Sequence, residues 1–550
     1  MSHAASTVLP RIPLVVQLGF AGSRHLLDNA AHPDLDEAEF HAQVLEHLVS
    51  MMQEMPRTLG LSERHFFCGV SQIAIGADTI FTRACMRLSI RQRIFLPQRC
   101  EAYLAAVSGN GERDFTGAQV AVAEELLRST HIIEDRVVSQ SPRRSEQFED
   151  VNLELVGVSD VLIALRRADA EGKPGGTMDL IERARARHRP LLEITVAVKD
   201  GGPVFSDEWH WNKPESKKDH ARHFTPPVLP SVMRKCVMRD GGDYAGVLKD
   251  FLSTQAGKHQ WWFKKAALGI IGAHVAATVC AATGLAFKAP FEGMLRVLLG
   301  VEFLLLVIGL CWHLWLHRSQ SAKRWATARL VSEVARSVNA MAQVPGDLGH
   351  LFALPLPEFL RPLLHTLNVF HLETTRTLER GMWSDRRDAY VHNRLARPDG
   401  GQIAYYAKQR RKAGSRHRFA NFVFYLGGAT ALAATLVELL IECDCTFPGF
   451  PGWILDPLTR HHAFFEHLPG FLAIILPVLS VAALSLAASF DLEARKHTYE
   501  EMLRALEQHE EFIRGAKSEH EFAALVLQTE MRLLGENVNW FSRRVFTGVT

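Results

Sequence analysis

Four long apolar stretches in the C-terminal half constrain the fold of this chain more than any other feature. They cover residues 266–287, 297–316, 419–441 and 468–490. A helix needs about 20 predominantly apolar residues to cross some 30 Å of hydrocarbon, and each stretch has that length. A single stretch would also fit a buried helix of a large soluble core, but four in one chain make that alternative negligible. The sequence therefore predicts an all-α membrane region with four transmembrane helices and long cytoplasmic helices.

Basic residues predict the orientation of these stretches, which form two pairs. The connections inside the pairs carry only Lys288, Arg296 and Arg460. The other flanks carry Lys264, Lys265, Arg318, Lys323, Arg324, Arg410, Arg411, Lys412, Arg416, Arg418, Arg495 and Lys496. Because Lys and Arg are enriched on cytoplasmic flanks, both hairpins should enter from the cytoplasm and return to it. The N-terminus also lacks the basic-then-apolar plan of a signal peptide, so we expect both termini to be cytoplasmic.

The two hairpins resemble an internal repeat. A charged helical stretch follows the second apolar segment, and another follows the fourth. Aligning Trp325 with Tyr499 places Glu333 on Glu507 at the same offset, with apolar residues at helical spacing in both copies. Each copy is then a two-span hairpin with a cytoplasmic helical tail.

The first 200 residues have a different pattern, in which short apolar runs alternate with longer helical stretches. The runs are LVVQLGF, HFFCGVS, RIFLP, DVLIAL and PLLEITV, between residues 13 and 195. Such alternation predicts an α/β doubly wound, Rossmann-like domain with a parallel sheet. Ligands of such sheets bind at the carboxyl ends of the strands, beside the reversal of strand order. The loops that follow the strands are therefore the place to look for a site.

Three of these loops are marked by glycine. Their candidate ligand-binding residues are Gly19, Gly22, Ser23 and Arg24 in the first, Ser71, Gly76 and Asp78 in the second, and Gly175, Gly176 and Thr177 in the third. Glycine lets a backbone approach an anion, arginine can pair with phosphate in a bidentate fashion, and a helix start offers free N–H groups. A structural turn is the better interpretation of each loop alone, but the three together favour a phosphate-bearing ligand.

These loops, in this order, resemble the SLOG superfamily, which includes DNA-processing protein A and the "lonely guy" phosphoribohydrolases. The resemblance covers about residues 12 to 198 and implies a nucleotide-derived ligand, such as a cyclic oligonucleotide or an ADP-ribose derivative, bound by the residues above. Two positions depart from the family. Gln72 replaces a usual glycine, and Leu180 stands where the enzymes have a catalytic glutamate, with Glu182 two positions further along. The resemblance therefore implies sensing rather than phosphoribohydrolase activity.

The membrane half resembles SLATT-type modules, which accompany SLOG domains in bacterial conflict systems. The resemblance covers about residues 260 to 530 and is carried by Tyr390-x3-Arg394 and Trp325-x3-Arg329-x3-Glu333. It implies an effector of anti-phage defence in the bacterial inner membrane. In such an effector the cytoplasmic domain senses a nucleotide second messenger, and the spans assemble into a homo-oligomeric pore that aborts the infection.

The chain divides on these patterns into five segments. These are a SLOG-like domain (1–200), a connector of unassigned role (201–260), a first hairpin with its helix (261–345), a cytoplasmic helical segment (346–417) and a second hairpin with its helix (418–550). With 62 basic and 60 acidic residues the net charge is +2, so we expect no bulk nucleic acid as a partner. The histidines at 461, 462 and 467 match no closed zinc spacing, and we expect neither metal nor cofactor. Cys443 and Cys445 would face the exterior, where they could bridge chains.

Two acidic residues lie inside the apolar stretches at similar predicted depth. Glu302 and Glu438 are pore-lining candidates, because intramembrane carboxylates usually face an aqueous path; contact with outer headgroups, or protonation in lipid, is an equal alternative. The principal rival function is a membrane-anchored enzyme that hydrolyses an N-glycosidic or phosphate bond with Asp78 or Asp179. A transporter is disfavoured, since the spans hold few polar groups and only one internal proline, Pro477.

Overall fold

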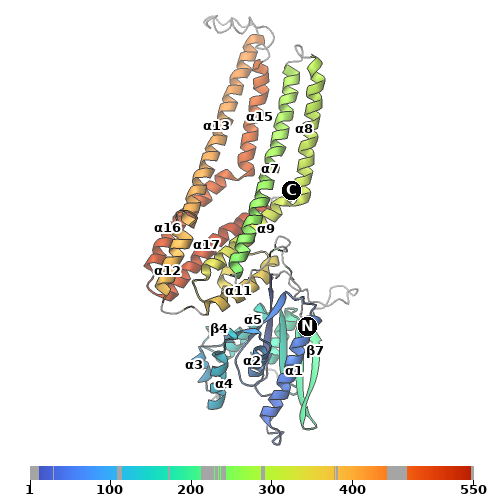
Figure 1. Cartoon of the computed structure of the whole chain (residues 1–550), viewed down its shortest axis with the longest axis vertical. Helices are drawn as coiled ribbons and strands as arrows, with labels where there is room; N and C mark the ends of the chain where they lie inside the picture. The colour runs from blue at the N-terminus through green and yellow to red at the C-terminus, as the bar shows by residue number, and fades with distance from the viewer. Residues whose placement is uncertain are drawn as a thin grey trace, which may run out of the picture. The chain divides into compact units, whose positions relative to one another are not determined.

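The computed structural model describes residues 12–28, 30–107, 114–170, 174–211, 243–286, 292–376, 382–442 and 468–546, with single positions at 228, 233, 236 and 378. The chain forms two compact units. Unit 1 contains Met1–Leu248 and Met341–Glu379, and unit 2 contains Lys249–Ala340 and Arg380–Thr550. Figure 1 shows both units and labels many of their elements.

Unit 1 is built on a seven-stranded sheet of order β4-β3-β2-β1-β5-β6-β7. The strands are β1 (Leu14–Gly22), β2 (His65–Ser71), β3 (Arg91–Leu96), β4 (Ile132–Val137), β5 (Val161–Arg167), β6 (Leu191–Lys199) and β7 (Gly202–His210). Strands β1 to β6 all pair with their neighbours in parallel, and only the β6–β7 pair is antiparallel. This confirms the predicted parallel α/β sheet. The strand order reverses between β1 and β5.

Strand β7 lies in a segment that the sequence assigned to a connector beginning at residue 201. Asp200 and Gly201 both have positive φ, 52° and 83°, and join β6 to β7 as a two-residue hairpin turn. Positive φ at both central residues is the geometry for which Asp-Gly is favoured. The sheet therefore continues to His210.

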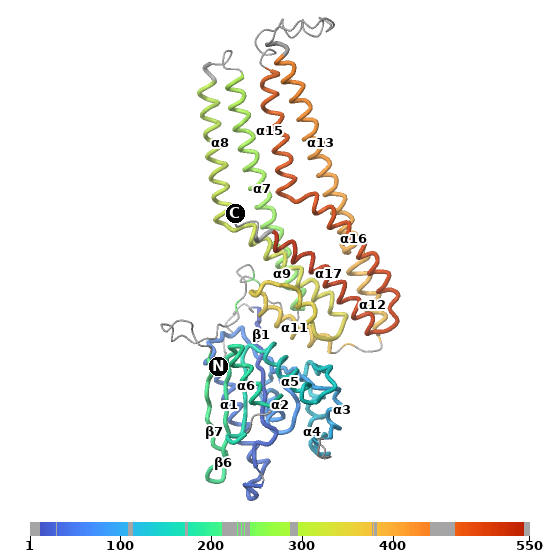
Figure 2. The backbone as a smooth tube through the Cα atoms, turned by 180° about the vertical axis from the view of Figure 1, so that it is seen from behind, coloured from blue at the N-terminus to red at the C-terminus, as the bar shows by residue number. Residues whose placement is uncertain are grey.

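Helices cover both faces of the sheet (Figure 2). On one face, Val16, Leu18 and Phe20 of β1 pack with α1 (Glu37–Thr58) and α2 (Ala77–Arg87). On the other face, Ala21 packs with α5 (Arg144–Val158) and α6 (Thr177–Ala186). Two further helices, α3 (Cys100–Leu104) and α4 (Gly117–Leu127), form a cluster with β3. Alternate side chains of β1 thus point to opposite faces of the sheet and pack against a separate layer of helices on each face.

A segment from the membrane half of the sequence completes unit 1. It includes α10 (Gly349–Phe352), the short η2 (Glu358–Leu360) and α11 (Arg361–Thr375). Strand β1 pairs with β5 only from Leu18 onward, and the amide of Val15 instead donates to the Thr366 hydroxyl at 2.9 Å. We call residues 341–379 the strap. The predicted 346–417 segment is thus divided between the two units, because α11 satisfies backbone groups of the sheet.

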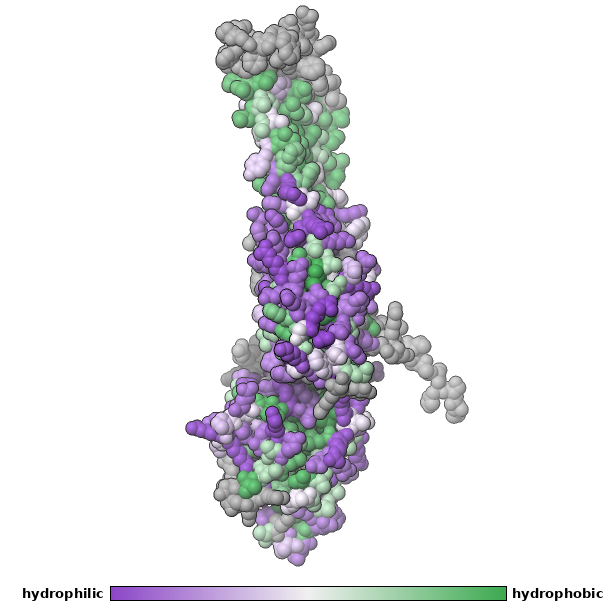
Figure 3. Space-filling model, turned by 90° about the vertical axis from the view of Figure 1, so that its left-hand side faces the viewer, coloured by the Kyte–Doolittle hydropathy of each residue, from purple (hydrophilic) through white to green (hydrophobic). Residues whose placement is uncertain are grey.

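Unit 2 contains four helices long and apolar enough to cross a membrane. They are α7 (Tyr244–Ala286), α8 (Glu292–Ser319), α13 (Gln402–Glu442) and α15 (Leu468–Ser489). Within each pair the helices approach closely at glycine: a Cβ on Gly269 would lie 1.6 Å from the Trp312 ring, and one on Gly427 would lie 2.1 Å from the Ser480 hydroxyl. The face seen in Figure 3 is predominantly apolar over the upper part of these helices.

A helix turns away after each apolar pair. Gln320 (φ 47°) precedes α9 (Ser321–Met341), and Asp491 (φ 48°) precedes α16 (Leu492–Gly515). A left-handed non-glycine residue at both junctions supports the repeat, because this backbone region is uncommon for such residues. If Gln320 is aligned with Asp491, however, Trp325 no longer aligns with Tyr499. The two alignments differ by three residues.

The Tyr390-x3-Arg394 motif belongs to the core of unit 2. It spans α12 (Trp383–Tyr390) and the π-helical η3 (Val391–Ala396), which pack near α17 (Glu519–Phe546). Arg394 donates two hydrogen bonds, at 2.8 and 2.7 Å, to the fully buried carboxylate of Glu530, and the Tyr390 hydroxyl donates a third at 2.8 Å. A buried carboxylate with three donors is strongly held, so this motif is explained by folding.

Candidate functional site

The loops after β1, β2 and β5 converge where the strand order reverses. The Ser23 amide donates to the carbonyl of Leu165 in β5 at 2.9 Å, and the Ala77 amide donates to the Ser23 carbonyl at 3.2 Å. Gly76 has φ 76°, and a Cβ there would lie 2.0 Å from the Arg24 carbonyl oxygen. Only glycine permits this crossing of two backbones. The crevice beside such a reversal is where open α/β sheets bind ligands.

The glycines of the first loop have a different role from the one the sequence indicated. Gly19 and Gly22 lie inside β1, not in the loop after it. A Cβ on Gly19 would be 2.1 Å from the Ser159 hydroxyl, and one on Gly22 would be 2.1 Å from the Ala77 Cβ. Close packing of helices on the strand accounts for both glycines, so only Ser23 and Arg24 of this group lie in the loop.

Ser71 lies at the end of β2 and is fully buried. Its hydroxyl donates to the Gln72 carbonyl at 2.7 Å and accepts from the Gln92 amide at 2.8 Å. Both hydrogen-bonding functions of the hydroxyl are thus used inside the protein. Ser71 therefore shapes the second loop without presenting its side chain to a ligand.

Asp78, in the first turn of α2, is the most perturbed acid of the group. It is 4% exposed, and its carboxylate accepts from the Ala74 amide at 3.1 Å. Burial raises the pKa of Asp78 to about 7, although the Ala74 amide and the nearby Arg24 guanidinium stabilise the charged form. This carboxyl group therefore gains or loses its proton near neutral pH.

The third loop is held by contacts to α5. Gly175 has φ 72°, and a Cβ there would lie 2.7 Å from the Phe148 Cβ. Gly176 is the N-cap of α6, and Thr177 is the first residue of that helix. The Asp179 carboxylate accepts from the Gly175 amide at 3.3 Å and from the Asn152 amide at 3.1 Å. The Asp179 carboxylate thus already occupies part of the helix start that the sequence indicated as an anion-binding position.

The structure adds four side chains to the site: Tyr103, Asp114, Arg144 and Phe148. The guanidinium carbons of Arg24 and Arg144 lie 5.6 and 5.9 Å from the centre of the Phe148 ring. Phe148 therefore connects the first loop with the third. These residues come from α3, α5 and the approach to α4, and no glycine adjoins Tyr103, Arg144 or Phe148 in the sequence. The Arg-x3-Phe spacing on a helix was the only sequence signal.

The charges of this cluster leave an excess of cations. Asp114, with a side chain 2% exposed, forms ion pairs with Arg24 at 3.8 Å and with Arg144. Partial burial and repulsion from Arg24 lower the pKa of Arg144, and burial raises the pKa of Tyr103 to about 12, so the phenol stays neutral. Two guanidiniums that share one carboxylate beside an aromatic ring suit a phosphate group and a stacked base.

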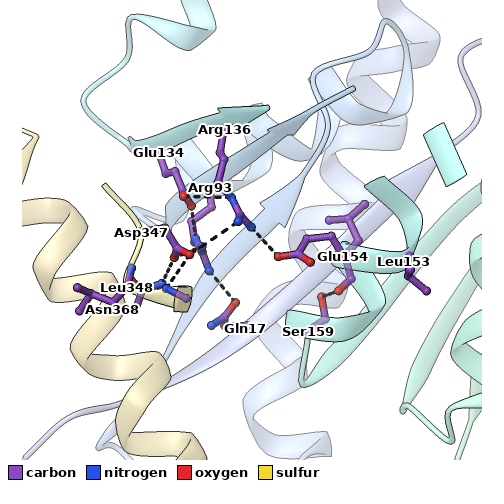
Figure 4. Close-up of polar contacts among 12 residues, drawn as sticks. Gln17, Arg93, Glu134, Arg136, Leu153, Glu154, Ser159, Asp347, Leu348 and Asn368 are labelled. Carbon is purple, nitrogen blue, oxygen red and sulfur yellow. Dashed lines mark hydrogen bonds and ion pairs between the residues drawn. The ribbon is translucent and has the colours of Figure 1, made fainter. Parts of the chain in front are cut away.

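A second polar cluster in unit 1 holds the strap on the sheet (Figure 4). Arg93, 2% exposed, pairs with Glu134 and, at 2.8 Å, with Asp347 of the strap, and donates to Gln17 at 3.3 Å. Asn368 donates to Asp347 at 2.6 Å. A cavity of about 360 Å³ adjoins this cluster. Arg93 is already paired with two carboxylates, so the cluster is built to hold the strap, not to receive an anion.

The two acids of the apolar helices lie on different helices. Glu438 of α13 contacts the start of α15, where a Cβ on Gly470 would lie 2.4 Å from its carboxylate. Glu302 of α8 is partly exposed.

Gly272 in α7 has open space beside it, whereas the space beside Gly269 is filled by Trp312 of the same hairpin. Of the small residues near the first span, Gly272 is thus available for contact with another helix.

No metal-ligand cluster of three or more His, Cys, Asp or Glu side chains occurs among the residues that the structure describes. The histidines at 461, 462 and 467 and the cysteines at 443 and 445 lie outside those residues. Comparisons of the chain with protein-family models, with curated proteins and with solved structures find no match in any of the three.

Proposed function

We propose that unit 1 is a sensor for a nucleotide-derived, phosphate-bearing ligand and that unit 2 is the membrane effector it controls. One observation supports the sensor: the guanidiniums of Arg24 and Arg144 lie 5.6 and 5.9 Å from the centre of the Phe148 ring and both pair with Asp114, beside the reversal of strand order. The SLOG-like order of the loops points to a cyclic oligonucleotide or an ADP-ribose derivative. A phosphate would supply the missing negative charge, and a base could stack on the exposed part of the ring.

Asp78 supports a second candidate function, hydrolysis of the bound nucleotide. A carboxyl group with a pKa of about 7 suits general acid–base work at neutral pH. Sensing is favoured because Asp78 is buried, and because Asp179 is engaged by Gly175, Asn152 and Arg183. A hydrolase would have to expose Asp78 on binding its substrate.

The strap supplies a route from sensor to membrane. It belongs to unit 1, but the residues on both sides of it in sequence, α9 before and α12 after, belong to unit 2. A ligand that binds better to one arrangement of the strap would shift the population toward that arrangement. We infer that the two states are separate chains and a homo-oligomer in which the hairpins assemble. The homo-oligomer opens a pore or disrupts the bacterial inner membrane.

The broader biological role follows from the SLOG and SLATT resemblance. Permeabilisation of the host membrane in response to a messenger made during phage infection would be abortive infection. The four apolar helices and their largely exposed outer faces are compatible with either lipid or neighbouring copies around each hairpin.

Ligand binding to the full-length chain tests the proposal. The purified protein in detergent is titrated with cyclic dinucleotides, cyclic trinucleotides, cyclic ADP-ribose isomers and NAD while its thermal unfolding is followed. A ligand that binds only the folded state raises the melting temperature. We expect one class to do so in a saturable manner without being consumed. Steady turnover would support the hydrolase, and a melting temperature unchanged by the whole panel would contradict both.

A further inference from the structure

A cavity in unit 2 lies between the post-span helices α16 and α17. Its volume is about 510 Å³, within the usual range of small-molecule sites. The lining residues come from the first turns of α16 and the last turns of α17, which run antiparallel at this point. Asp491, at its edge, follows two residues after the end of α15. The cavity is therefore close, along the chain, to the inner end of the fourth apolar helix.

The polar atoms of this cavity that lack partners are all donors. Nε and Nη2 of Arg495 and the indole Nε1 of Trp540 are buried, with no hydrogen-bond partner among the described residues. Both residues line the cavity. Buried donors in native proteins nearly always have a partner, so the arrangement calls for an acceptor in the cavity. A guanidinium and an indole N–H from facing helices suit a phosphate or carboxylate oxygen.

Additional cations surround Arg495. Lys264, two residues before the first apolar stretch, has its pKa lowered by burial and then by Arg416, Arg495, Lys412 and Arg329. Arg329 also stacks 4.4 Å from the centre of the Trp540 ring. Arg532 and Arg543 line the cavity itself. The cations near Lys264 and Arg495 thus come from five helices of unit 2.

Acidic residues also face the cavity and limit this excess. Asp491, Glu501 and Glu536 line it. Burial raises the pKa of Glu536, while Arg329 next to it opposes the rise. In the lining itself three arginines, at 495, 532 and 543, face these three acids. The additional cations are those near Lys264, beside the cavity.

We propose that the α16–α17 cavity binds a phosphate-bearing anion, with Arg495 and Trp540 as donors. The shared chemistry is a phosphate group, supplied either by the headgroup of an anionic lipid or by a free phosphate compound. Its position beside the end of an apolar helix favours the lipid, because anionic headgroups lie at that level and attract basic residues. This site is separate from the nucleotide site of unit 1, and it stands whether or not unit 1 senses a nucleotide.

The test uses the delipidated full-length chain in uncharged detergent. Dioctanoyl phosphatidylglycerol, dioctanoyl phosphatidylcholine and inorganic phosphate are each titrated, and binding is followed by thermal shift and native mass spectrometry. We expect phosphatidylglycerol to bind saturably and at least tenfold more tightly than phosphatidylcholine. Competition by inorganic phosphate would assign recognition to the phosphate alone; its failure to compete would assign it to the lipid as a whole.

Two variants and a matched control locate the site. Arg495→Gln should weaken phosphatidylglycerol binding about tenfold, and Arg532→Gln, an exposed position at the rim, about threefold. Arg504→Gln makes the same charge change on the same helix, at a side chain 74% exposed and paired with Glu500, and should alter binding less than twofold. Equal affinity for both lipids, or equal effects of Arg495→Gln and Arg504→Gln, would overturn the proposal.

Discussion

We expect ligand recognition to depend on Arg24 and Arg144, because both guanidiniums pair with the same carboxylate, Asp114. Arg24→Ala should remove a charge-assisted contact to phosphate worth about 1.5 to 3 kcal/mol, or roughly ten- to a hundredfold in affinity. Thr177→Val should cost less, since it removes one neutral hydroxyl. Isothermal calorimetry on the full-length chain checks both. Arg128→Ala, at a side chain 78% exposed, is the control, and unchanged affinity in Arg24→Ala would place the ligand elsewhere.

Asp78 gives the protein a pH dependence whose sign is fixed by burial. The folded pKa of about 7 lies above the ordinary value of 3.8, so this group favours folding below pH 4 and loses that contribution as pH rises toward 7. The full effect is on the order of 4 kcal/mol. Asp78→Asn should therefore be more stable than the wild type at pH 8 and show a flatter profile. Denaturant unfolding between pH 5 and pH 8 tests this; parallel profiles for the two proteins would refute it.

At the scale of elements, the strap is the part that local sequence patterns did not reveal. The periodicity around residues 346–417 indicates helices, but it does not say which surface each helix covers. That is decided by partners far away in sequence, such as Val15 for Thr366 and Arg93 for Asp347. The β6–β7 hairpin differs, because its Asp-Gly turn is a local signal. The glycines show a further limit of prediction from sequence. Gly22 leaves room for Ala77, which a Cβ there would contact, but a glycine that makes room for a ligand would look the same in the sequence.

The strap makes unit 1 dependent on residues from the membrane half. A fragment ending at residue 211 would leave the Val15 amide without Thr366 and Arg93 without Asp347. An unpaired buried group costs about 1 to 3 kcal/mol, and more when it is charged. We expect this fragment to be poorly soluble when expressed alone and to be rescued by co-expression with residues 341–379. A fragment that is monomeric and equally stable without them would show that the strap is dispensable.

At the scale of the whole molecule, the apolar helices and the parallel sheet were predictable, because both follow from contiguous residue patterns. The ligand cluster was predictable only in part: Arg24 and Asp78 belong to glycine-marked loops, whereas Arg144 and Phe148 reach the site from α5, more than a hundred residues after Arg24 in the sequence. The Arg-x3-Phe spacing places these two side chains on one face of a helix, but it does not say that this face meets the loop of Arg24.

The topology carries its own expectation. Basic residues flank the same ends of all four apolar helices, so both termini and the segment from Lys323 to Arg416 should be cytoplasmic. Single cysteines introduced near Asp399 should resist a membrane-impermeant thiol reagent in intact cells and react after permeabilisation. A cysteine in the connection between α13 and α15 is the positive control. Labelling near Asp399 in intact cells would show that the orientation is opposite to the predicted one.

Leakage from proteoliposomes tests the central claim most directly. The full-length protein is reconstituted around a trapped dye, the nucleotide panel is added on the side of unit 1, and leakage and oligomer size are followed together. A ligand with equal affinity for the closed and the assembled state would not shift the equilibrium between them. A messenger that binds the assembled state better should therefore raise both the leakage and the oligomer size. We predict ligand-dependent leakage that in Arg24→Ala requires roughly ten- to a hundredfold more ligand, with Glu302→Gln and Glu438→Gln reducing cation flux more than assembly. Leakage unchanged by every nucleotide, or steady consumption of a nucleotide without leakage, would contradict the account.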